Sequence, residues 1–80
     1  MTAMVDWTLY IQSNPKVLYG KPIIKNTRIS VDLILEKLAV GDKFDDLLDA
    51  YPNITEKDIY ACLMFAAFSI KNEIVYSIAS

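Results

Sequence analysis

The sequence predicts a mainly α single domain, in which three helices follow a short N-terminal β-hairpin or arm. The chain has 80 residues, which is enough for one small domain. After Ser30, apolar side chains recur at the i, i+3, i+4, i+7 spacing of a helix face. Before Ser30, short β-prone pieces alternate with residues that favour turns. We therefore divide the single domain 1–80 into an arm at 1–29 and helices at 30–40, 44–50 and 55–78.

The arm contains four short β-prone pieces, which read TLYIQ, KVLY, PII and RIS. Asn14-Pro15, Gly20 and Asn26 separate them, and these residues form turns or tolerate a positive φ. Strands this short are not stable alone, so we expect the arm to pack on the helices or to pair across a dimer. Trp7 has few other anchors near it, and it would be an interaction hot spot if it were exposed.

Start and stop signals bound the first two helices. Ser30 can cap the first helix, and Asp42 is the expected cap of the second. Pro52 disfavours the helical conformation at Tyr51, so the second helix should stop near Ala50. The apolar stripes are Val31, Ile34, Leu35 and Leu38 in the first helix and Phe44, Leu47, Leu48 and Tyr51 in the second.

The third helix has the clearest start, with Thr55 as cap and Asp58 three residues later. The run from Ile59 to Phe68 is apolar at every position and covers every direction around the helix axis. Such a helix must be buried on all sides, and two short helices cannot cover it. We therefore expect an oligomer, at least a dimer, or a partner protein. The expected oligomer interface consists of Met64, Phe65, Phe68 and Ile70.

The composition argues against an enzyme. The chain has no histidine, which removes the usual nucleophile–base pairs and most transition-metal sites. Cys62 lies in the apolar run and is interpreted as a core residue. Four aspartates could bind a hard cation, but they lack a calcium-loop pattern and better complement a helix dipole. They are Asp42, Asp45, Asp46 and Asp49. We expect no catalytic residue, cofactor, metal or small-molecule substrate.

The expected cellular compartment follows from the absence of a signal-peptide pattern and of a membrane-spanning run in the sequence. The N-terminus has neither a basic start nor an apolar run of signal-peptide length. The run from Ile59 to Phe68 is well short of the roughly 20 residues that cross a bilayer. The single cysteine fits a reducing compartment. We therefore expect a cytoplasmic protein with no membrane contact.

The run GKPIIKNTRISVDLILEKLAVGDKFDDLLDAYPNITEKDIYACLMFA, from residue 20 to about 67, resembles domain-of-unknown-function family 433. The resemblance implies a homeodomain-like, helix-turn-helix domain preceded by a short β segment, found in prokaryotes. Members are commonly encoded beside a toxin that resembles a PIN-type ribonuclease, so the resemblance implies an antitoxin of the VapB type. Asn26 replaces the usual Gly, and Lys43-Phe44 replaces the usual Ser-Pro at the start of the second helix.

The charge distribution divides the chain into two parts. In the helix-turn-helix interpretation the recognition helix starts at Glu56, but residues 32–58 contain 8 acids and 3 bases, which suits phosphate poorly. Residues 13–31 contain four bases and no acid. They form either an anion-binding surface or a protected edge in which Arg28 pairs with Asp32. The expected contacts to nucleic acid or to an anionic partner are Lys21, Lys25, Arg28, Lys57 and Tyr60.

Two functions remain. The first is a DNA-binding antitoxin of a type II toxin–antitoxin pair, which forms a homodimer, binds operator DNA and neutralises a PIN-like ribonuclease. The alternative is a protein-interaction or oligomerisation module with no DNA binding. The expected partners are a second copy of the chain, a PIN-like toxin and operator DNA.

Overall fold

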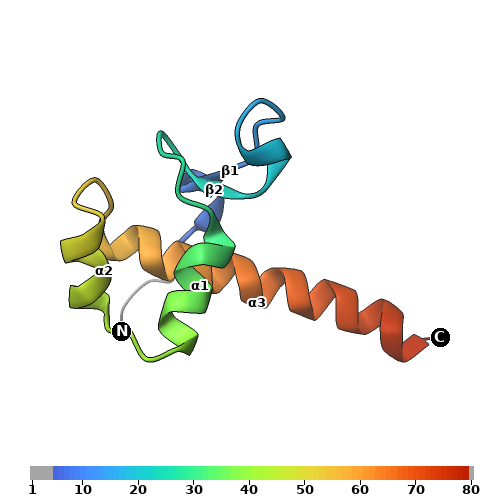
Figure 1. The fold of residues 1–80 in the computed structure, drawn as a ribbon. Helices are drawn as coiled ribbons and strands as arrows, with labels where there is room; N and C mark the ends of the chain where they lie inside the picture. The colour runs from blue at the N-terminus through green and yellow to red at the C-terminus, as the bar shows by residue number, and fades with distance from the viewer. Residues whose placement is uncertain (1–4, 80) are drawn as a thin grey trace.

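The computed structural model describes residues 5–79 of the chain, with side chains as far as residue 72. In chain order the elements are η1 (Trp7–Leu9), β1 (Ile11–Gln12), η2 (Leu18–Gly20), β2 (Ile23–Ile24), α1 (Val31–Ala39), α2 (Phe44–Ala50) and α3 (Glu56–Ala79). Helices α1 and α2 lie against the first half of α3, and the second half of α3 extends past the rest of the chain (Figure 1). The three predicted helices and the short N-terminal sheet are confirmed.

The arm has fewer strand residues than the sequence predicts. Only the last two residues of TLYIQ are a strand, because the Asp6 carboxylate accepts a hydrogen bond from the Thr8 N–H at 3.1 Å and caps η1. The piece KVLY is not a strand but a turn, in which Leu18 and Tyr19 have φ of 50° and 57°. Gly20 donates to the Val17 carbonyl at 3.1 Å, so local turn bonds replace a ladder there.

The two strands form an antiparallel pair in which Ile11 lies opposite Ile24 and Gln12 opposite Ile23. The turn that follows has Asn26 at φ 63°, as its tolerance of positive φ predicts. Thr27 fixes this turn, because its hydroxyl donates to the Ile24 carbonyl at 2.7 Å. The chain therefore passes from β2 through this turn to the start of α1.

The helix caps explain where the three helices begin. The Ser30 hydroxyl accepts from the Leu33 N–H at 3.3 Å, as predicted. Thr55 and Asp58 form a reciprocal box, with N–H to side-chain distances of 2.8 and 3.3 Å. The prediction that Asp42 caps α2 is wrong. Lys43 is the N-cap, because its N–H donates to the Asp46 carboxylate at 2.7 Å.

The core lies between the sheet, α1, α2 and the first half of α3. Trp7 fastens the arm to α3, since its ring lies 4.9 Å from Phe65 and 5.4 Å from Phe68, measured between centroids. Trp7 is thus half-buried and is not the exposed hot spot that the sequence left open. The buried apolar side chains are Ile11, Ile23, Ile24, Val31, Ile34, Leu47, Ile54, Ile59, Ala61 and Cys62.

Candidate functional site

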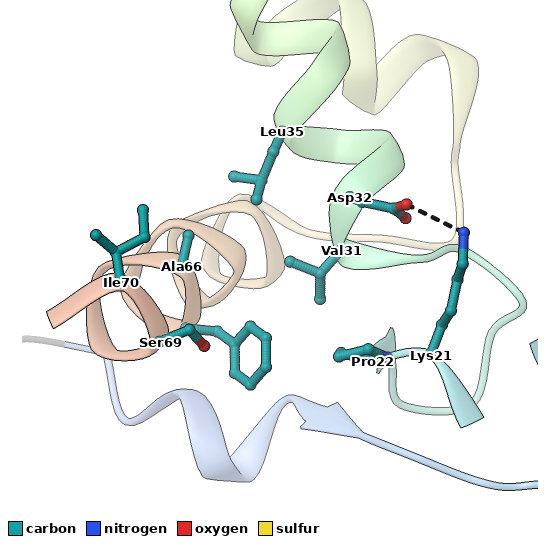
Figure 2. A pocket seen from close by; sticks show the side chains of 9 residues that line it. Lys21, Pro22, Val31, Asp32, Leu35, Ala66, Ser69 and Ile70 are labelled. Carbon is teal, nitrogen blue, oxygen red and sulfur yellow. Dashed lines mark hydrogen bonds and ion pairs between the residues drawn. The ribbon is translucent and has the colours of Figure 1, made fainter. Parts of the chain in front are cut away.

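An apolar groove opens where α1, α3 and the segment before β2 meet. Its volume is about 330 Å³. Val31 and Leu35 form the α1 wall, and Pro22 closes the arm side (Figure 2). The α3 wall consists of Phe65, Ala66, Ser69 and Ile70. These residues are far apart in the sequence, so the groove exists only in the folded chain.

One ion pair marks the edge of this groove. The Lys21 ammonium lies 3.2 Å from the Asp32 carboxylate, at the end of the groove away from α3 (Figure 2). A hydrogen bond from the Ser30 hydroxyl, and then the Lys21 partner, lowers the pKa of Asp32 below its usual value. Arg28 does not pair with Asp32, whose carboxylate contacts Lys21 instead. Both partners are exposed, so the pair adds little stability.

The basic arm consists of Lys16, Lys21, Lys25 and Arg28, and all four side chains are exposed. Lys25 and Arg28 flank the Asn26 turn, whereas Lys16 lies in the turn after β1. Within residues 5–72, Lys21–Asp32 is the one ion pair, so the other three cations have no acidic partner there. The arm therefore presents positive charge to solvent.

The predicted recognition helix has a different surface. Lys57 is exposed in the first turn of α3, but Glu56 and Asp58 lie on either side of it. The Tyr60 ring lies 5.1 Å from the Phe44 ring in an edge-to-face contact that joins α2 to α3. The Tyr60 ring is therefore used in part for packing between helices, and acidic residues flank Lys57.

The predicted oligomer residues do not share one face. Phe65 packs on Trp7 and lines the groove, and Phe68 also contacts Trp7. Met64 is half-buried, whereas Ile70 is exposed at the groove mouth. Sequence reasoning missed two further exposed apolar side chains on α3, Leu63 and Ala67. The 3–4–3 spacing of Tyr60, Leu63, Ala67 and Ile70 was the signal that could have found them.

The remaining chemistry is limited. Burial raises the pKa of the Cys62 thiol to about 12, so the thiolate that reacts is scarce at neutral pH. No three acids, cysteines or histidines come close enough to hold a metal ion in the part of the chain that the structure describes. Among those same residues, no helix has the length and apolar character to cross a membrane.

Comparison with known proteins identifies the family. A family model described as "Protein of unknown function (DUF433)" matches residues 11–66, from β1 into α3. The crystal structure of a DUF433 member protein from Anabaena variabilis ATCC 29413 is similar, with a TM-score of 0.71 and 31% sequence identity. The similarity covers 88% of this chain and 68% of that one. None of the curated proteins matches this chain. The assignment made from the sequence is confirmed, and the chain belongs to the DUF433 family.

Proposed function

We propose that this chain is a protein-interaction module that binds an apolar segment of a partner protein in the groove between α1 and α3. The observation that carries this proposal is the groove itself, whose walls are apolar apart from Ser69 and the ion pair at one end. Sites for small molecules need several convergent polar groups to fix orientation, and this groove offers few. Apolar walls suit the side chains of another protein instead.

The partner that we propose is a PIN-like ribonuclease, so that the chain acts as the antitoxin of a type II pair. The family resemblance supports this choice of partner, and the exposed apolar groove supplies a surface that such a toxin would cover. We further propose that the chain has no enzymatic activity and no cofactor of its own. In this role it inhibits by binding.

A blocking variant tests this function. Ser69→Arg places a long cation inside the groove, whereas Ala50→Arg adds the same charge at the exposed end of α2. Each variant is co-expressed with the proposed partner, a PIN-like ribonuclease sought in the reading frame next to this gene, and the complex is measured by affinity capture and by growth. We expect the Ala50→Arg protein to hold the toxin and the Ser69→Arg protein to release it. A neighbourhood without such a reading frame, or capture unaffected by Ser69→Arg, would contradict the proposal.

A second function, binding of operator DNA, is favoured by the exposed cations of the arm. In this proposal α2 and α3 form a helix-turn-helix unit, but Lys25 and Arg28 contact phosphate more than Lys57 does, because acids flank Lys57. Arg28→Ala should lower the slope of log affinity against log salt by about 0.9 for each phosphate that the side chain neutralises in the wild-type complex. Lys37→Ala, which removes an exposed cation of α1, is the matched control. Absence of binding by the wild-type protein at low salt would favour the module without a DNA role.

A further inference from the structure

The turn after β1 carries a tyrosine that the rest of the described chain leaves uncovered. Tyr19 is 100% exposed, so its ring gains nothing from packing within the fold. The backbone of Leu18 and Tyr19 is left-handed, with φ of 50° and 57°, which is unfavourable for a residue that has a Cβ. Residues held in such conformations are concentrated at functional sites. The turn thus keeps a large ring in solvent at a position that a glycine would occupy more easily.

Hydrogen bonds hold this turn in its strained shape. The Val17 N–H donates to the Asn14 carbonyl at 2.9 Å, and the Lys16 N–H donates to the Asn14 side-chain oxygen at 2.9 Å. On the other side of the tyrosine, the Lys21 N–H donates to the Leu18 carbonyl at 3.1 Å. The ring therefore projects from a fixed backbone, and only its two side-chain torsions have to be ordered when it binds a ligand.

Positive charge lies at the same end of the molecule as this ring. The turn after β1 and the turn after β2 both project from the sheet on the side away from α3 (Figure 1). Lys16 is exposed in the first turn, and Lys25 and Arg28 are exposed in the second. No acid occurs in residues 13–31, and none of these three cations has an acidic partner within residues 5–72. The two turns therefore combine an exposed aromatic ring with three available cations.

We propose that the two turns of the arm bind single-stranded nucleic acid, in which the Tyr19 ring stacks on an unpaired base and the cations contact phosphates. Proteins that bind single strands combine these two features, a cationic surface and aromatic side chains on which bases stack. The face of a base is accessible in a single strand, whereas neighbouring base pairs cover it in a duplex. The inference goes beyond operator binding, which needs α2 and α3, although both use Lys25 and Arg28.

A pocket on another protein is the competing explanation for an exposed aromatic ring. Aromatic anchors of protein interfaces lie in well-packed contacts from which water is excluded. In this turn Leu18 is 37% exposed, but the exposed cations Lys16 and Lys21 lie on either side of Leu18 and Tyr19 in the sequence. Such surroundings favour an anionic ligand, and a nucleic-acid strand supplies one negative charge with every base.

Variants of the ring test the stacking contact. Binding is measured by fluorescence anisotropy with a labelled DNA strand of about 12 nucleotides at roughly 50 mM salt. Tyr19→Leu and Tyr19→Gly should each weaken binding by about tenfold, because both remove the ring, whereas Tyr19→Phe should bind as the wild type does. All three should fold, since the side chain is fully exposed. Leu9→Ala removes an exposed side chain outside both turns and is the matched control. Equal binding by Tyr19→Leu and wild type would overturn the proposal.

Salt dependence and strand form test the rest of the contact. Lys16→Ala should lower the slope of log affinity against log salt by about 0.7 for each phosphate of a single strand that Lys16 neutralises, and Lys37→Ala on α1 should leave it unchanged. The same sequence as a duplex should bind more weakly than the strand. A duplex that binds more tightly would overturn this inference and leave the operator proposal standing. Absence of strand binding by the wild type would also overturn it, and would favour an acidic protein as the ligand of the turn.

Discussion

The packing of Trp7 on α3 holds the arm against the helices, and Trp7→Ala should remove this contact. Full truncation of a buried Trp costs about 3–5 kcal/mol, and each aromatic pair contributes about 0.5–1.5 kcal/mol. Because Trp7 is half-buried and touches two rings, we expect the free energy of unfolding to fall by about 2–3 kcal/mol. At roughly 0.05–0.15 kcal/mol per residue, that is a large share of the stability of this chain.

Urea denaturation followed by far-ultraviolet circular dichroism measures this loss, because Trp7 is the one tryptophan and its own fluorescence disappears with it. Leu9→Ala is the matched control, since Leu9 lies in the same η1 turn and is exposed. It should change the free energy of unfolding by less than about 0.5 kcal/mol. A Trp7→Ala protein as stable as the Leu9→Ala protein would refute the claim that this contact holds the arm.

Three further predictions concern strain, pH and catalysis. Tyr19→Gly should stabilise the fold by about 0.5–1 kcal/mol in thermal unfolding, because Tyr19 is fully exposed and its φ of 57° is unfavourable for a non-glycine residue. An unchanged free energy of unfolding would contradict strain in this turn. The pKa of Asp32 is lower in the folded chain than the ordinary value of about 3.9, so the ionised carboxylate stabilises the fold at pH values above that ordinary pKa. This contribution is lost as the pH falls through the folded pKa. The stability difference between wild type and Asp32→Asn should therefore shrink as the pH falls below the ordinary pKa of an aspartate, and a difference that stays constant with pH would contradict the pairing. The purified protein should cleave no RNA, and cleavage lost on Asp45→Asn would overturn the non-enzymatic role.

Local signals were sufficient for the helices. Ser30 and Thr55 have hydroxyls that accept backbone N–H groups at the predicted starts, and Asn26 adopts the predicted positive φ. The KVLY piece misled the strand prediction, because its residues favour strands while its backbone follows a left-handed turn. Nothing in the identities of Leu18 and Tyr19 signals that conformation.

The candidate sites depend on tertiary packing, which single-residue patterns do not contain. An all-round apolar helix such as α3 does not reveal which face the core takes. Only the docking of Trp7 on Phe65 and Phe68 shows that these two rings face the arm, whereas Leu63 and Ala67 are exposed to solvent. The groove likewise needs Pro22 and Val31 to meet α3.

The central claim, that the groove binds a protein partner, is tested most directly by hydrogen–deuterium exchange of the full chain with and without the PIN-like ribonuclease that we propose as its partner. We expect slower exchange in the two groove walls, residues 31–35 and 65–70, with no change in α2. Unchanged exchange in both walls when the ribonuclease is bound, or protection of α2 alone, would show that the groove is not the binding site.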